Sequence, residues 1–306
     1  MIVVCCDGTW NKADDQTNVH RTYRLLARCL TGGSEQPIGD DRLVTRGRAP
    51  DGRQVYLYYA TGVGTRRWQR GSGGLFGAGL GENIRQAYSF LAENAAPDDE
   101  LFVFGFSRGA FTVRSLCGLL GCAGLPTTFC EEAVRAAWRF YRVPPGQRAG
   151  SAQEAELVRH EPRGAKVRFL GVYDTVGSLG VSVPQLRWVN GLVERSLGGV
   201  IRFHDAALGR NVETACQALA IHERRGTFKP VVWSRAPGLV RRPDGSLGEQ
   251  RVLQVWFAGS HADVGGGYPQ TDLSDIPFDW MVRRAMEEGL QVDEAVLRAA
   301  AGGNCS

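Results

Sequence analysis

Short runs of apolar residues alternate along this chain with segments in which apolar positions recur at helical spacing. The continuous apolar runs predict buried strands, at residues 2–6, 55–60, 101–104, 167–173 and 252–257. The helical spacing predicts helices, at residues 20–30, 82–95, 109–121, 130–141, 208–221 and 277–289. Strands that are apolar throughout, rather than at every second position, indicate a sheet covered on both faces. We therefore predict an α/β fold with a doubly wound, mostly parallel sheet and helices on both faces.

The regular order of these elements predicts a single catalytic-type domain over residues 1–306, interrupted by loop or cap insertions. Residues 143–165 are rich in Pro, Gly, Gln and charge, which is typical of a surface excursion. Residues 178–200 mix Val, Leu and Trp with glycines, which fits a cap over an apolar pocket and ordinary surface packing equally well. The glycine-rich stretch 71–81 fits a flexible loop and a gating segment equally well.

The predicted strands end in polar or glycine-rich turns that hold most of the reactive side chains. These turns are Asp7-Gly8-Thr9, Gly105-Phe106-Ser107-Arg108-Gly109, Asp174-Thr175 and Gly259-Ser260-His261-Ala262-Asp263. In an open α/β sheet, binding sites lie at the carboxyl ends of the strands. The sequence therefore predicts a functional site where these turns meet.

Ser107 is the candidate nucleophile. It lies in a G-x-S-x-G sequence, between the predicted strand 101–104 and the predicted helix 109–121. In that context Gly105 and Gly109 allow a sharp turn that exposes the serine hydroxyl. The amino-terminal end of the following helix then faces the negative charge that develops in the reaction.

A nucleophilic serine needs a base, and the base needs an acid that orients it. Of the five histidines, His261 alone directly follows an apolar strand and lies in a glycine-rich loop. Asp174 follows the strand 167–173 and lies between the serine and the histidine in the chain, which is the α/β-hydrolase order. Asp263 is the alternative acid, although its position suits bracing of the histidine loop. We favour Ser107, Asp174 and His261 as the triad.

The oxyanion of the reaction intermediate requires N–H donors. The backbone N–H of Arg108, which follows the nucleophile, is the first candidate, and Gly8 and Thr9 in the turn after the first strand are the second. Asp7 would orient that turn through bonds to backbone N–H groups. This mechanism requires no cofactor and no metal.

Several sequence blocks together resemble a known family. They are C-D-G-T-W-N near the start, G-F-S-R-G-A-F, G-V-Y-D-T-V-G-S, A-I-H-E-R-R-x-x-F-x-P and W-F-A-G-S-H-A-D-V-G-G-G-Y. In this order, from Asp7 to Tyr268, they resemble the catalytic domain of type VI secretion phospholipase effectors and their uncharacterised relatives. The resemblance implies an α/β-hydrolase fold, the Ser107–Asp174–His261 triad, and hydrolysis of acyl esters in phospholipids or similar lipids. One departure concerns the family's D-E-R-R block, which begins here with His222.

Two other functions fit the same residues. Asp7, Asp174, His261 and Asp263 could hold a divalent ion in a metal-dependent hydrolase, because oxygen and imidazole ligands suit such ions. That interpretation leaves the serine turn unexplained. A hydrolase-like fold can also serve as a non-catalytic interaction module, since fold alone does not set function.

Composition and charge limit the classes of partner that we expect. The formal net charge is +4, and the arginines are scattered among acids without a basic block, so nucleic acid is not an expected partner. We expect an ester or phospholipid substrate and, at most, peripheral contact with a membrane. The eight cysteines form no C-x-x-C pair, which argues against a zinc ribbon.

The first apolar run is too short for a signal peptide, and no run reaches the roughly 20 residues needed to span a bilayer. We therefore expect cytoplasmic synthesis without a signal peptide, and any export would use a non-classical, type VI-like route. The sequence identifies no immunity or delivery partner.

Overall fold

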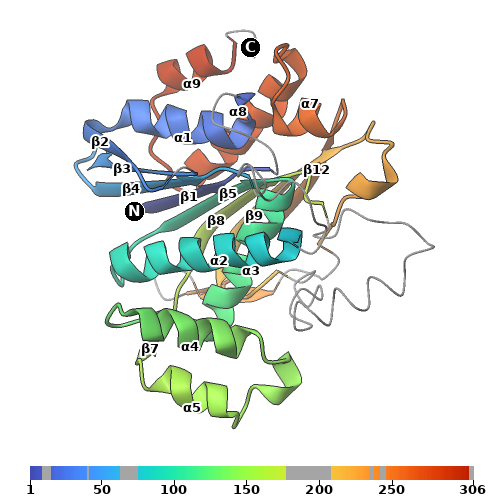
Figure 1. Cartoon of the computed structure of the whole chain (residues 1–306). Coiled ribbons are helices and arrows are strands. Elements are labelled where there is room, and N and C mark those ends of the chain that lie inside the picture. Colours follow the sequence, from blue (N-terminus) through green and yellow to red (C-terminus); the bar gives the residue numbers. More distant parts are fainter. Residues whose placement is uncertain are drawn as a thin grey trace.

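The computed structural model describes residues 1–8, 15–39, 41–62, 75–176, 208–233, 238–241 and 246–302. Eight strands of this described chain form one sheet, in the spatial order β12-β9-β8-β5-β1-β4-β3-β2 (Figure 1). Their bounds are β1 Ile2–Cys6, β2 Thr31–Pro37, β3 Arg42–Arg48, β4 Gln54–Ala60, β5 Leu101–Phe106, β8 Val167–Tyr173, β9 Val212–Ala220 and β12 Arg251–Phe257. Two short antiparallel pairs join β6 Leu125–Pro126 to β7 Pro162–Arg163, and β10 Leu239–Arg241 to β11 Leu247–Glu249.

The six strands from β12 to β4 run parallel, and β3 and β2 are added antiparallel at one edge. All five predicted strands are present, each within a few residues of its expected bounds. Because parallel strands end at the same edge of a sheet, the turns after β1, β5, β8, β9 and β12 meet there. The predicted doubly wound, mostly parallel α/β-hydrolase fold is confirmed.

Helices cover both faces of the sheet (Figure 1). Side chains alternate along β1, so that Ile2, Val4 and Cys6 pack into one core and Val3 and Cys5 into the other. The first core contains residues of α2, α3 and α4, and the second contains residues of α1 and α8. The helix bounds are α1 Asn18–Cys29, α2 Leu75–Asn94, α3 Arg108–Ala123, α4 Glu131–Tyr141, α5 Ala152–Val158, α7 His261–Gly265, α8 Asp272–Glu287 and α9 Glu294–Ala300.

The helix predicted over residues 208–221 is wrong, because most of this segment is strand β9. Its alanines suggest a helix by intrinsic preference, but every residue of β9 is buried. It lies between β8 and β12, and Ala215 and Ala218 are buried in the two different cores on either side of the sheet. Burial on two faces thus overrode local preference.

Two regions carry structure that the apolar pattern did not indicate. Strands β2 and β3 form an antiparallel hairpin, and β2 is exposed along its whole length, so it has no buried positions to detect. The excursion 143–165 contains α5, which packs against α4, and strand β7, which pairs with β6. The predicted cap at 178–200 and residues 71–74 of the glycine-rich stretch lie outside the described residues, whereas residues 75–81 form the start of helix α2.

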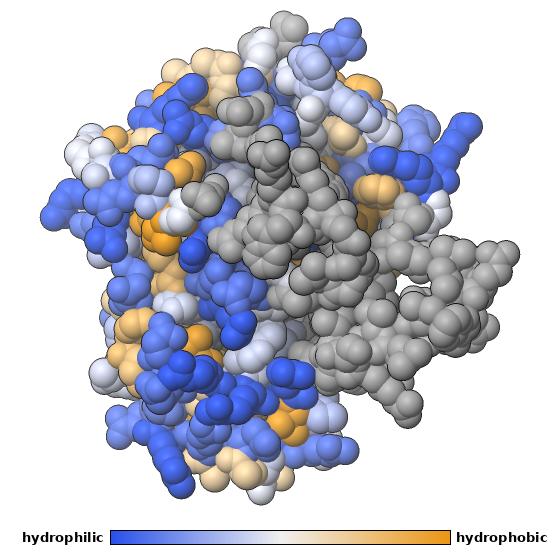
Figure 2. All heavy atoms as spheres, in the orientation of Figure 1, coloured by the Kyte–Doolittle hydropathy of each residue, from blue (hydrophilic) through white to orange (hydrophobic). Residues whose placement is uncertain are grey.

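On the face shown in Figure 2, hydrophilic side chains cover much of the described surface, especially over α4 and α5. Apolar side chains appear there in small groups between them. None of the helices in the described part of the chain combines the length and the hydropathy needed to cross a bilayer.

Candidate active site

Ser107 occupies a strained turn between β5 and α3. Its backbone has φ 57° and ψ −119°, a region that residues with a side chain rarely adopt. The Ser107 N–H donates to the Tyr173 carbonyl over 3.0 Å, which ties the turn to the end of neighbouring strand β8. The whole residue is only 6% exposed. This is the conformation of a nucleophile elbow, in which a sharp turn presents one hydroxyl at the edge of the sheet.

The glycines on either side of the serine are required by close approach of the backbone. A Cβ atom at residue 109 would lie 2.1 Å from the Cys6 carbonyl oxygen and 2.5 Å from that of Asp7. A Cβ at residue 105 would lie 2.7 Å from the Gly109 carbonyl oxygen. Gly109 therefore lets the start of α3 press against the end of β1, which brings the Asp7 turn next to the serine.

Asp174 and His261 are in direct contact. Asp174 follows β8 with φ 37° and is fully buried. One carboxylate oxygen accepts a bond from the Ala220 N–H at 3.1 Å, and the other lies 2.6 Å from His261 Nδ1. Because an ionised carboxylate can only accept, we assign the proton of this pair to Nδ1. Nε2 is then left unprotonated and able to act as a base.

Asp263 has a different structural role. His261 is the first residue of α7, and Asp263 caps this helix through bonds to the Ser260 N–H at 2.7 Å and the Ser260 hydroxyl at 2.8 Å. Of the two acids proposed from the sequence, Asp174 bonds the imidazole and Asp263 braces the loop that carries it.

Two aromatic rings flank the imidazole of His261. The Phe106 ring lies 4.6 Å from it, and the Phe228 ring meets it edge-on at 4.7 Å, both measured between ring centroids. Gly265 allows the histidine loop to sit close to Phe106, because a Cβ there would lie 1.9 Å from the ring. Phe106 immediately precedes Ser107, so this contact brings the histidine loop to the serine turn. The described residues give the Ser107 hydroxyl no hydrogen bond to His261, and such bonds often tighten only when substrate is bound.

The predicted oxyanion donors are in three different situations. Arg108 is the first residue of α3, and the N–H groups of a first turn point out of the amino-terminal end of the helix. The Gly8 N–H donates to the Asp7 carboxylate at 2.7 Å, so it is engaged within its own turn. Thr9 lies outside the described residues.

Asp7 links the turn after β1 to the start of α1 and to β4. Its buried carboxylate also accepts bonds from the Thr17 hydroxyl at 2.5 Å and the Tyr59 hydroxyl at 2.8 Å. Thr17 caps α1 and forms a β-bridge with Gly266 of the histidine loop. Burial raises the pKa of Asp7 to about 6, although the three bonds act in the opposite direction.

The four residues of the metal alternative are not arranged as one ligand set. Asp7 bonds Thr17, Tyr59 and its own turn, whereas Asp263 bonds Ser260. Within the described ranges, no group of three or more His, Cys, Asp or Glu side chains is placed to hold a metal ion.

Sequence reasoning missed several residues that contact the histidine loop. His222 Nδ1 accepts a bond from the Gly259 N–H at 2.9 Å, and the Glu223 carboxylate accepts one from the His261 N–H at 3.2 Å. Phe228 contacts the imidazole itself. All three belong to the A-I-H-E-R-R-x-x-F-x-P block, whose departure at His222 drew attention to the segment but not to its contacts.

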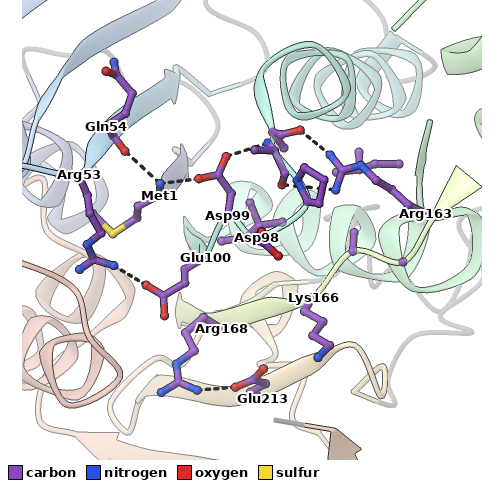
Figure 3. A pocket seen from close by; sticks show the side chains of 17 residues that line it. Met1, Arg53, Gln54, Asp98, Asp99, Glu100, Arg163, Lys166, Arg168 and Glu213 are labelled. Atoms are coloured by element: carbon purple, nitrogen blue, oxygen red, sulfur yellow. Dashed lines mark hydrogen bonds and ion pairs between the residues drawn. The ribbon is translucent and has the colours of Figure 1, made fainter. Parts of the chain in front are cut away.

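A pocket of about 590 Å³ lies at the amino-terminal ends of the parallel strands, on the side of the sheet away from the Ser107 turn (Figure 3). Ion pairs line it, including Arg53 with Glu100 at 2.8 Å and Arg168 with Glu213 at 2.5 Å. Strand β5 separates it from Ser107 by roughly 20 Å, given the rise per residue of a strand. We assign this pocket no part in chemistry at Ser107.

Comparisons with known proteins agree with this architecture. A region of a yeast protein, "Uncharacterized protein YEL023C" of Saccharomyces cerevisiae, is 27% identical over 261 residues, which is 77% of this chain and 33% of that protein. The crystal structure of an uncharacterised protein from Pseudomonas aeruginosa superposes with a TM-score of 0.53 at 19% identity, covering 96% of this chain and 46% of that one. The chain thus spans a third of its yeast relative and less than half of the Pseudomonas protein.

The family model for the "T6SS, Phospholipase effector Tle1-like, catalytic domain" matches residues 1–284, from the first strand through most of α8. This range contains the serine turn, Asp174 and the histidine loop. The chain therefore belongs to the family of Tle1-like type VI secretion phospholipase effector catalytic domains.

Proposed function

We propose that this chain hydrolyses carboxylic esters by two-step acyl transfer through Ser107, His261 and Asp174. The observation that carries the proposal is the 2.6 Å contact between Asp174 and His261 Nδ1, beside a serine held at φ 57°. A buried carboxylate bound to a histidine, next to a strained and presented serine, is the arrangement that activates a hydroxyl for attack.

In the first step, the Ser107 hydroxyl attacks the ester carbonyl carbon while His261 Nε2 accepts its proton. Asp174 stabilises the imidazolium that forms. The Arg108 N–H holds the oxyanion together with a second donor, an effect worth about 3 kcal/mol for each donor. His261 then protonates the leaving alcohol, and water activated by the same histidine releases the acyl group and restores Ser107.

The proposed substrate class is the acyl ester of a phospholipid or a similar lipid. Family membership supports this class, because the matching model describes a phospholipase effector. Export through a type VI secretion system is part of the same proposal and rests on the family alone.

The first test is hydrolysis of p-nitrophenyl esters with acyl chains of graded length. We expect turnover by the wild type that is lost in Ser107→Ala and unaffected by a chelator. Ser115→Ala on the same helix is the matched control, and it should keep wild-type turnover. Turnover that survives Ser107→Ala but is lost with chelator would overturn the serine mechanism in favour of a metal site. A protein that hydrolyses no ester would instead support the interaction-module alternative.

A second assay addresses the lipid itself. Release of fatty acid from phosphatidylcholine vesicles, compared with release from triacylglycerol emulsions, separates a phospholipase from a neutral lipase. Faster release from the vesicles, again dependent on Ser107, is the expected result. Release from short-chain esters alone would retain the mechanism and reject the lipid substrate.

A further inference from the structure

An ion pair that the mechanism does not use lies behind the catalytic histidine. Glu223 follows β9, and its side chain is only 4% exposed. Its carboxylate accepts three bonds from Arg225: from the backbone N–H at 2.8 Å, from Nε at 2.8 Å and from an η nitrogen at 2.7 Å. The same carboxylate accepts the His261 backbone N–H at 3.2 Å. One buried anion therefore binds both its own loop and the loop of the catalytic base.

Arg225 continues the connection on its other side. Its guanidinium carbon lies 3.9 Å from the centroid of the Phe228 ring, within the range of a cation–π contact. Phe228 in turn meets the imidazole of His261 edge-on. Glu223, Arg225 and Phe228 thus form a continuous path that begins at the backbone of His261 and returns to its side chain.

This path supplies a restraint that Asp174 alone does not. A hydrogen bond at Nδ1 fixes one atom of the imidazole and leaves the plane of the ring able to tilt. Phe106 and Phe228 limit that tilt, and the position of Phe228 depends on Arg225. Because Nε2 must reach both the Ser107 hydroxyl and the leaving group, a small tilt would misplace the proton transfer.

We propose that Glu223 and Arg225 are positioning residues for His261, acting as one unit through the His261 backbone and the Phe228 ring. This inference rests on the proposed serine mechanism. The electrostatics agree with this geometry, because the bonds from Arg225 lower the pKa of Glu223 to about 2.

The test is a double-mutant cycle with Glu223→Gln, Arg225→Met and the double variant, assayed on a short-chain p-nitrophenyl ester. Each single variant should lose about 10- to 100-fold in kcat, the size of effect expected from a misplaced catalytic group, with KM within about twofold of wild type. The double variant should lose no more than the worse single variant, because the second substitution removes nothing further. Arg225→Lys, which keeps the charge but not the two-pronged geometry, should restore part of the loss.

Arg224→Met is the matched control, since this exposed arginine precedes Arg225 directly, and it should keep wild-type kcat. Thermal unfolding of every variant reports whether the fold is retained. Arg225 is 55% exposed, so Arg225→Met and Arg225→Lys carry the test even if Glu223→Gln does not fold.

The outcomes separate this inference from the proposed function. An inactive wild type, or an active Ser107→Ala, would remove the serine mechanism on which the inference rests and would overturn both. If the wild type is active and Ser107→Ala is not, wild-type kcat in Glu223→Gln and Arg225→Met would overturn the positioning role alone. Losses of kcat that add in the double variant would also overturn it, because two independent structural effects would then explain them.

Discussion

Replacing Asp174 with Asn tests the contact at the centre of the site with almost no change of shape. The asparagine oxygen can still accept the Ala220 N–H, so the backbone bond of 3.1 Å is retained. The amide nitrogen then faces His261 Nδ1 across the 2.6 Å contact, and it is a donor. Nδ1 must become the acceptor, which moves the imidazole proton to Nε2 and leaves no base facing Ser107.

The expected loss of kcat is about 10⁴-fold, the size found when the same exchange in a serine protease traps the wrong tautomer. That ratio corresponds to about 5 kcal/mol of lost transition-state stabilisation. The loss in folding stability should be much smaller, about 1 kcal/mol, because a single hydrogen bond is exchanged and the other is kept.

The assay is steady-state hydrolysis of a p-nitrophenyl ester, with thermal unfolding measured in parallel. Asp51→Asn is the matched control, because its carboxylate pairs with Arg53 near the opposite edge of the sheet. It should leave kcat unchanged. A folded Asp174→Asn protein with kcat within about tenfold of wild type would refute the role that we assign to the Asp174–His261 contact.

Three further predictions concern the residues around the triad. Gly109→Ala should destabilise the protein by about 3 kcal/mol in urea unfolding, because its Cβ would lie 2.1 Å from the Cys6 carbonyl oxygen. Gly146→Ala, which has open space around it, is the control and should be neutral; equal unfolding midpoints for the two variants would contradict the close approach. Asp7 binds a proton more tightly when folded, with a pKa of about 6 against about 4 unfolded, so its contribution to stability falls as pH rises through this window. The difference in unfolding free energy between wild type and Asp7→Asn should therefore decrease by about 2 kcal/mol from pH 4.5 to 7, and a difference independent of pH would reject the raised pKa of Asp7. Asp263→Ala should remove the cap of α7 and lower the unfolding free energy by about 1 kcal/mol, whereas Asp263→Asn can still cap and should lower it less. A larger loss of kcat in Asp263→Asn than in Asp174→Asn would reverse the assignment of the two acids.

The amino-acid sequence by itself determined the local features of this protein. The apolar run 101–104 followed by G-x-S-x-G was sufficient to predict β5, the turn at Ser107 and α3. Asp174 was likewise identified by its place directly after an apolar strand. Such features are readable because strand burial, glycine turns and helix starts each depend on residues only a few positions apart.

Tertiary structure alone decided the features that depend on distant neighbours. The alanine-rich segment of β9 is a strand because β8 and β12 flank it, and the polar strand β2 exists because β3 pairs with it. The contact between Asp174 and His261 joins residues 87 positions apart, and that between Glu223 and His261 joins residues 38 apart. Their energies come from burial and bond geometry between chain segments that only the folded sheet brings together, so no local pattern could show that Asp174 contacts His261 or single out Glu223.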